Sequence, residues 1–174
     1  MTAGALDLLV RSLDAAMVVV TTSAAGERAG CLVGFHAQAS IHPWQYAVWL
    51  SKANHTYRVA LLSEHLAVHV LDHGERPLAE LFGGVTGDEV DKFARCDWHE
   101  GPGGVPLLDR CPNHIVLRRS AVLDVGGDHA CVVGAPVEAR HTGSVTPLRY
   151  ADVAQLEPGH DVDERPCPPT ERAG

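Results

Sequence analysis

The stretch IVLRRSAVLDV (residues 115–125), GGDH (126–129) and ACVVGAPVEAR (130–140) decides the fold of this chain. Both outer segments are rich in β-branched and small apolar residues, and β-branched residues are typical of strands. The Gly-Gly-Asp-His segment supplies the residue types that tight turns between antiparallel strands require. The stretch therefore predicts a β-hairpin, with strands over residues 115–125 and 130–140.

Shorter runs of the same character occur earlier in the chain. Residues 17–22 (MVVVTT) are followed by a turn-forming segment and a second apolar run over 30–39, which together predict a first hairpin. Further strands are predicted over residues 46–50 and 66–71. About six strands, joined mostly by hairpins, indicate a mainly β fold. We expect a six-stranded antiparallel β-barrel with a few covering helices.

Four short helices are predicted from apolar spacing and good helix formers, over residues 5–15, 57–64, 75–82 and 88–95. They are too few and too irregularly spaced for a doubly wound parallel sheet. No G-x-G-x-x-G motif opens a helix, which argues against a Rossmann dinucleotide site. The charged side chains of the fourth helix are interpreted as a solvent-facing surface: Glu89, Asp91 and Lys92.

The 174 residues suit one domain, predicted over residues 1–156 and followed by a flexible, proline-containing tail over 157–174. The formal net charge of -8 argues against nucleic acid as a partner, because phosphate backbones require a basic surface. We expect no membrane span, since no apolar run is long enough, and no signal peptide, since the N-terminus has no basic region followed by an apolar core. Five cysteines without a C-x-x-C pair are typical of a reduced cytoplasmic protein, and no ligand spacing specifies a metal site.

A polar segment lies between the predicted strand 46–50 and the predicted helix 57–64. Residues 51–56 (SKANHT) offer two hydroxyls, an amide, an ammonium and an imidazole. A helix N-terminus presents unpaired N–H groups and the positive end of the helix dipole, so this segment could hold the phosphate of a cofactor. The alternative is a capped helix start, with Asn54 or Ser51 as the N-cap.

Several stretches, taken in order, resemble the flavin reductase-like family, the FMN-binding split barrels. The four that carry the resemblance are VVVTT (18–22) with its Gly-containing turn, GF (34–35) through SIHP (40–43), SKANHT (51–56), and GDH (127–129) with VVGAPV (132–137). Two more match in order and spacing, DKFA (91–94) and GGVPLL (103–108). The resemblance therefore runs from about Leu13 to Tyr150.

The resemblance implies a six-stranded antiparallel split β-barrel that forms a homodimer, with FMN, or sometimes FAD, at the subunit interface. Such proteins take a hydride from NADH or NADPH and pass reduced flavin on, often to a partner monooxygenase. The expected activity is that of an NAD(P)H:flavin oxidoreductase. Because flavin and nicotinamide carry the redox chemistry, no acid–base constellation is needed in the sequence.

The resemblance also implies roles for individual residues. Donor side chains would hold the FMN phosphate or ribityl chain: Ser51, Lys52, Asn54 and Thr56. A second set would run beside the isoalloxazine ring: Gly34, Phe35, His36 and Ala37. The catalytic residue would be His129, which would face the nicotinamide and orient it or pass a proton. Trp98 and Tyr150 are candidates for stacking, or simply core residues.

Structural alternatives exist for several of these residues. Phe35 and Trp49 are more typical of core or dimer packing than of ligand contact, His36 is equally typical of a turn, and His129 of an exposed hairpin.

Gly34 departs from the family, because many members carry a hydroxyl or amide residue there. One donor to the flavin would be lost, and residues 51–56 would then carry more of the affinity. Two other functions stay open: an oxidoreductase of this fold that uses a deazaflavin, and a non-catalytic flavin- or haem-binding protein.

Overall fold

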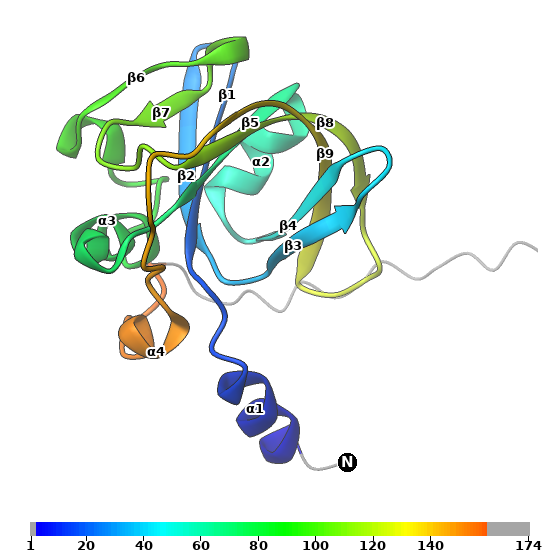
Figure 1. Cartoon of the computed structure of the whole chain (residues 1–174), viewed down its shortest axis with the longest axis vertical. Helices are drawn as coiled ribbons and strands as arrows, with labels where there is room; N and C mark the ends of the chain where they lie inside the picture. Colours follow the sequence, from blue (N-terminus) through cyan, green and yellow to red (C-terminus); the bar gives the residue numbers. More distant parts are fainter. Residues whose placement is uncertain (1–2, 160–174) are drawn as a thin grey trace, which may run out of the picture.

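A seven-stranded antiparallel sheet forms the centre of the molecule in a computed structural model that describes residues 3–159. Its strands lie in the order β2-β1-β5-β8-β9-β4-β3 (Figure 1). Their bounds are β1 Val18–Ala24, β2 Glu27–Val33, β3 His36–Ser40, β4 Gln45–Ser51, β5 His65–Val70, β8 His114–Leu123 and β9 His129–Arg140. The short strands β6 (Trp98–Glu100) and β7 (Pro106–Leu108) form a separate pair. The mainly β class is confirmed, with seven strands in the principal sheet rather than six.

The sheet curls, and its two edge strands follow one another in the chain. β2 pairs with β1 as far as Val33, and β3 begins to pair with β4 at His36. Only Gly34 and Phe35 connect them, and the Phe35 carbonyl accepts a hydrogen bond from the Trp49 amide at 2.8 Å. The prediction of one strand over residues 30–39 is therefore wrong, because the chain crosses from one sheet edge to the other at this point.

Alternating residues of the strands fill the inside of the curl. The fully buried side chains of this cluster include Val18, Val20, Val48, Leu50, Leu66 and Val68, each pair two residues apart on one strand. Successive side chains on a strand point to opposite faces, so this alternation produces one apolar face. Val19 instead faces a second cluster with Phe82 and Leu108. β1 is thus buried on both faces.

The helices lie around the sheet, and their bounds are α1 Ala3–Ser12, α2 His55–Leu62, α3 Arg76–Gly83 and α4 Tyr150–Val153. Single 3-10 turns are η1 His73–Glu75, η2 Lys92–Arg95 and η3 Pro102–Gly104. The predicted helix over 88–95 is reduced to η2, which Asp91 caps by accepting from the Phe93 amide at 2.9 Å. Lys92 is only 4% exposed, so its interpretation as a solvent-facing residue is wrong.

The predicted hairpin is confirmed as β8 and β9, and it places the Gly-Asp-His turn beside the polar segment 51–56. β9 also pairs with β4, with His129 opposite Ser51. The Lys52 amide donates to the Asp128 carbonyl at 2.9 Å. Two segments that are far apart in the sequence therefore meet at one end of the sheet.

Most of the predicted tail over 157–174 lies outside the described residues. Within the described part, the Gly159 amide donates to the Gly83 carbonyl at 3.1 Å, so the chain still contacts the end of α3 there. Cys31, Cys96, Cys111 and Cys131 are free thiols. Between residues 3 and 159, no helix combines the length and the apolar character that crossing a membrane requires.

Candidate functional site

A cavity of about 280 Å³ lies where the β2–β3 crossing meets the ends of β4 and α3 and the start of β9. Five of the residues that the sequence singled out line it: Gly34, Phe35, Ser51, Asn54 and His129. They come from three separate segments, which the pairing of β4 with β9 and the crossing beside Trp49 bring together. We refer to this space as the crossing cavity.

Four other predicted residues do not line the crossing cavity. His36 donates from Nε2 to the Ala16 carbonyl at 2.8 Å and accepts at Nδ1 from the Tyr46 hydroxyl at 2.7 Å, so it ties the segment before β1 to the opposite sheet edge. Ala37 is exposed on β3.

Lys52 and Thr56 are held by other partners. The Lys52 ammonium lies 2.6 Å from a carboxylate oxygen of Asp124, beyond β8. Thr56 is 1% exposed and lies beside the buried thiol of Cys31. Burial raises the pKa of that thiol to about 11, so Cys31 stays protonated and acts as a small core residue. The ammonium has three donors, so a ligand phosphate would compete with Asp124 for Lys52 without having to displace it.

Asn54 forms the polar end of the crossing cavity together with Ser51. Its side-chain oxygen accepts from the Thr56 amide at 2.9 Å, so Asn54 is the N-cap of α2 and one of the two capping alternatives is confirmed. Only the amide oxygen is used in the cap, which leaves the NH₂ group to face a ligand. Capping and ligand binding are therefore compatible at this residue.

His129 is held in place from two sides. Its Nδ1 lies 2.9 Å from a carboxylate oxygen of Asp128, and its ring meets the ring of Phe35 edge-on, with 5.3 Å between centroids. The hydrogen bond from His129 lowers the pKa of Asp128, which keeps that carboxylate ionised. An ionised partner at Nδ1 fixes the ring orientation and leaves Nε2 for a ligand.

Apart from Tyr150, the apolar wall of the crossing cavity was missed from the sequence. Its side chains come from the residue before β1, from β2, α3 and α4, and from the segment after α4: Met17, Leu32, Val33, Phe82, Tyr150, Val153 and Leu156. Of the two stacking candidates, Tyr150 lines the cavity and Trp98 does not. Trp98 packs edge-on against Phe93, and the Arg28 guanidinium lies 4.8 Å from its ring centroid. Only hydrophobicity marks the wall residues in the sequence, and core residues share that property.

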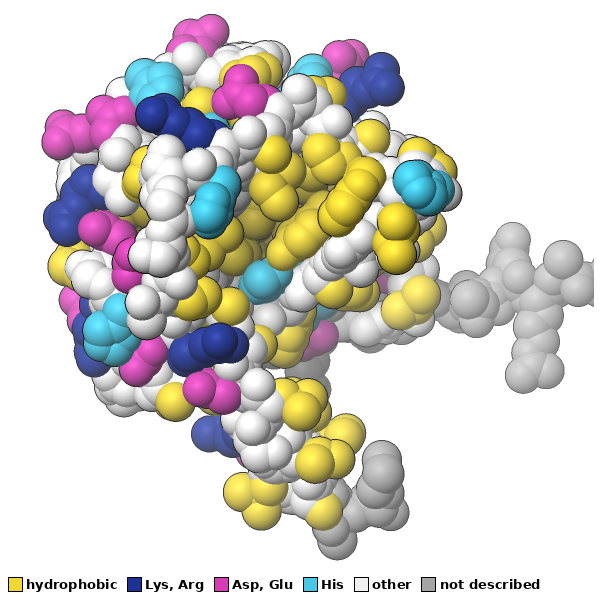
Figure 2. Space-filling view, in the orientation of Figure 1, with side chains coloured by type: hydrophobic (Ala, Val, Ile, Leu, Met, Phe, Trp, Pro, Cys, Tyr) yellow, Lys and Arg dark blue, Asp and Glu magenta, His cyan; other side chains and the backbone are white. Residues whose placement is uncertain are grey.

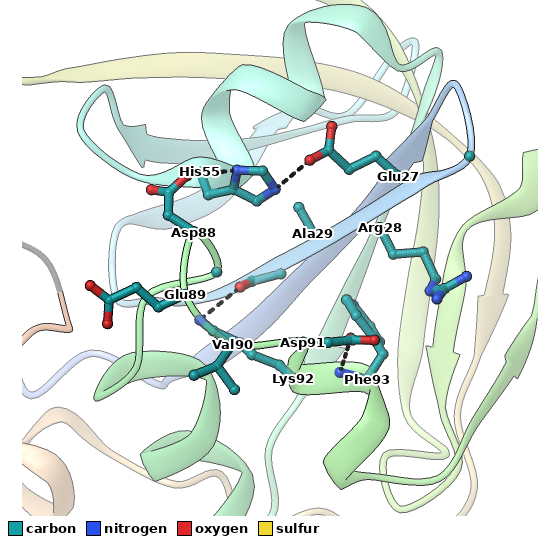
Figure 3. Close-up of a pocket in the computed structure, with 13 residues that line it drawn as sticks. Glu27, Arg28, Ala29, His55, Asp88, Glu89, Val90, Asp91, Lys92 and Phe93 are labelled. Carbon is teal, nitrogen blue, oxygen red and sulfur yellow. Dashed lines mark hydrogen bonds and ion pairs between the residues drawn. The ribbon is translucent and has the colours of Figure 1, made fainter.

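A second cavity, of about 330 Å³, lies between β2, the first turn of α2 and residues 87–93 (Figure 3). Figure 3 shows His55 between Glu27 and Asp88, with its two ring nitrogens 3.1 Å and 3.2 Å from their carboxylates. Arg58 also pairs with Asp88. These charged side chains therefore pair with one another. None of the residues to which the family resemblance gives a role lines this cavity. The crossing cavity is therefore the candidate site.

Comparison with known proteins identifies the family of this chain. The family described as flavin reductase like domain matches residues 10–156, which is most of the chain. This chain belongs to that family. The earlier resemblance to the flavin reductase-like family is therefore confirmed.

Three relatives illustrate the match. FMN reductase (NADH) RutF of Pseudomonas syringae pv. syringae (strain B728a) is 28% identical over 138 residues, covering 79% of this chain and 76% of that protein. A flavin reductase domain protein from Arthrobacter sp. FB24 has a TM-score of 0.77 at 22% identity, over 87% of this chain and 92% of that one. Nitrilotriacetate monooxygenase component B from Mycobacterium thermoresistibile has a TM-score of 0.70 at 26% identity, over 84% and 83% of the two chains. These likenesses place the curled sheet within the fold of the flavin reductase like domain family.

Proposed function

We propose that this protein is an NAD(P)H-dependent flavin reductase that binds FMN at the crossing cavity. The observation that carries the proposal is the meeting of Gly34, Phe35, Ser51, Asn54 and His129 around one space. Membership of the flavin reductase like domain family supports the same activity. The relative named FMN reductase (NADH) RutF favours FMN and NADH among the flavins and nicotinamides.

The residues around the crossing cavity fit a flavin. Met17, Leu32 and Phe82 supply an apolar wall for an aromatic ring system, and Ser51 and Asn54 supply donors at the opposite end for a ribityl chain or phosphate. The volume of about 280 Å³ lies just below the range of ligand sites, which is about 300–1,000 Å³. The cavity suits the ring better than the whole cofactor, so part of FMN would lie outside it.

Each group has a task that follows from its position. Bound flavin would supply the hydride acceptor. The apolar wall would exclude water from the ring, and Phe35 together with His129 would stand at the face where the nicotinamide arrives. Asp128 would hold the His129 ring so that Nε2 meets the nicotinamide.

The decisive experiment is an absorbance spectrum of the purified protein followed by an NADH oxidation assay with and without added FMN. We expect a flavin spectrum or none, and steady NADH oxidation that rises with FMN. A haem spectrum would identify a haem-binding protein. Flavin binding without oxidation of NADH or NADPH would identify a non-catalytic flavin-binding protein. Oxidation that responds to a deazaflavin but not to FMN or FAD would identify the deazaflavin alternative.

Lys52 and Asn54 are proposed to hold the phosphate end of FMN. We expect Lys52→Ala combined with Asn54→Ala to weaken FMN binding at least about tenfold, because two donors are lost at about 1–3 kcal/mol each. A fluorescence-quenching titration measures this. Melting temperatures must accompany it, because loss of the Asn54 cap alone costs about 1 kcal/mol of stability.

Asp124→Ala provides the matched control for Lys52. It breaks the same ion pair but leaves the ammonium free for the phosphate. We expect its FMN affinity to be unchanged or higher. If Asp124→Ala weakened binding as much as Lys52→Ala, the ion pair would act by holding the β8–β9 turn, and the phosphate role of Lys52 would be refuted.

A homodimer with flavin at its interface is the second part of the proposal. α1 stands away from the sheet (Figure 1), and Figure 2 shows hydrophobic side chains over its surface. Leu8, Leu9 and Leu13 are 71%, 63% and 73% exposed. Isolated helices shorter than about 12–15 residues are marginal in water, so this ten-residue helix needs a covering surface. A second copy would cover α1, and it would also enclose the part of FMN outside the crossing cavity.

We expect light scattering to give twice the chain mass of 18.6 kDa for the wild type. Leu8→Asp with Leu9→Asp should shift the protein to the monomer and weaken FMN binding, because both side chains are exposed within one chain. Asp7→Asn on the same helix breaks only the exposed pair with Arg11 and serves as the control. A monomeric wild type, or a double variant that stays dimeric, would contradict the role of α1.

The reduced flavin would serve a separate oxygenase. The likeness to nitrilotriacetate monooxygenase component B supports a role as the reductase of a two-component monooxygenase. Adding a candidate monooxygenase to the NADH and FMN assay, with substrate turnover as the measurement, tests it.

A further inference from the structure

Lys92 is a buried cation that joins two elements behind the crossing cavity. Its ammonium donates to the Gly30 carbonyl in β2 at 3.2 Å and to the Phe82 carbonyl in α3 at 3.1 Å. Figure 3 shows the side chain reaching from η2 to the strand. With 4% of its surface exposed, Lys92 has almost no contact with solvent.

The two elements that Lys92 joins are walls of the crossing cavity. Leu32 and Val33 follow Gly30 on β2, and Phe82 and Gly83 end α3. These four residues line the cavity, whereas Gly30 does not. The walls touch directly, since a Cβ added at Gly30 would lie 2.7 Å from the Phe82 ring. A Cβ added at Gly83 would lie 2.9 Å from the Leu32 side chain. The ammonium therefore ties the walls where they are already closely packed.

No carboxylate of the described residues lies within 4.0 Å of the Lys92 ammonium, so its charge has no ion-pair partner in that part of the chain. Burial lowers the pKa of Lys92, which reflects the cost of this charge. A buried charge is costly unless it is paired or hydrogen-bonded, and here two carbonyls accept from the ammonium. The ammonium lies 5.6 Å from the centroid of the Phe82 ring, whose side chain lines the cavity. A charge in such a low-dielectric setting acts over longer distances than it would in water.

We propose that Lys92 is a positioning residue that sets the two walls of the crossing cavity and places a positive charge behind Phe82, which favours reduced over oxidised flavin. The inference rests on the proposed flavin reductase function. A hydride carries two electrons and one proton from the nicotinamide to the neutral flavin ring. The reduced ring therefore gains one negative charge, while the nicotinamide becomes NAD⁺ or NADP⁺. Lys92 transfers no proton, and it acts through its charge and its two hydrogen bonds.

The test compares the affinities of the protein for oxidised and reduced FMN at pH 8. For the wild type we expect reduced FMN to bind at least about tenfold more tightly. In Lys92→Met this preference should fall about tenfold, which for a two-electron couple corresponds to a bound-flavin potential about 30 mV more negative. Lys92→Arg, which keeps the charge and the donors, should restore it. Arg95→Met removes an exposed charge from the same 3-10 turn and should match the wild type.

The possible outcomes separate the proposals. If the wild type binds no flavin, the proposed function fails. If it binds both forms equally, or if Lys92→Met weakens both forms by the same factor, Lys92 is a structural residue and the inference is wrong. Should Lys92→Met fail to fold by circular dichroism, Lys92→Gln replaces it, because its amide can donate to a carbonyl without a charge. In that case the preference of the wild type for reduced over oxidised FMN still tests the inference.

Discussion

Lowering the pH from 7 to 4 should remove about 3 kcal/mol of unfolding free energy through one side chain, His69 on β5. His69 is fully buried. Its Nδ1 donates to the Val19 carbonyl at 3.2 Å, and its Nε2 accepts from the Leu108 amide at 3.2 Å. Both ring nitrogens are thus committed in the neutral form, and the Nε2 acceptor is lost on protonation.

Burial lowers the pKa of His69 from 6.5 to about 3 in the folded protein, and the nearby His114 ring, 5.9 Å away between centroids, adds to the effect. Below pH 6.5 the unfolded chain binds a proton at His69 that the folded chain does not bind. Stability from this residue is therefore complete above pH 6.5. It is lost progressively as the pH falls toward 3.

Urea unfolding at several pH values between 7 and 4 measures the effect. His69→Gln keeps an amide donor and acceptor but does not titrate, so its stability should decline less steeply than that of the wild type. His141→Gln changes an exposed histidine and should follow the wild-type curve. Parallel curves for the wild type and His69→Gln would show that His69 does not carry the acid sensitivity.

His129→Ala should lower the rate of hydride transfer to bound FMN about 100-fold while changing the FMN dissociation constant less than about threefold. His129 lines the crossing cavity beside Phe35, and Asp128 fixes its ring. In the proposed site His129 would contact the nicotinamide, whereas other groups would hold the ring and the phosphate of FMN. Loss of the imidazole should therefore affect orientation for transfer more than flavin binding.

Anaerobic single-turnover reduction by NADH, followed by flavin absorbance, gives this rate. His99→Ala is the matched control, because His99 also pairs with an aspartate, Asp109, at 2.6 Å but lies on β6 and does not line the crossing cavity. A wild-type rate in His129→Ala would remove His129 from the reaction. An equal loss of rate and of flavin affinity would assign it to flavin binding instead.

Local patterns predicted well wherever neighbouring residues decide the structure. The β8–β9 hairpin follows from its Gly-Gly-Asp-His turn and flanking strands, and Asn54 caps α2 as its residue type indicates. The division of residues 30–39 into β2 and β3 was not predicted, because apolar and small residues continue through Gly34. Pairing with two different strands decides it: β2 pairs with β1 as far as Val33, and β3 pairs with β4 from His36 onward.

Lys92 shows the same limit. Beside Glu89 and Asp91 it has the sequence context of a solvent-facing residue, yet its ammonium is buried between the carbonyls of Gly30 and Phe82. Neither carbonyl is near Lys92 in the chain, since they lie 62 and 10 residues away. A charged residue is buried only where distant groups satisfy it, and no local pattern contains that information.

By itself the sequence determined the mainly β class, the final hairpin, the capped segment at residues 51–56 and the family. These follow from turn chemistry, strand alternation and motif order, which are properties of neighbouring residues. Only the tertiary structure decided that Gly34 and Phe35 cross between the edges of the sheet, that Ser51 lies opposite His129, and that Lys52 pairs with Asp124. Curling of the sheet joins segments that are distant in the chain, and the crossing cavity is formed by that closure.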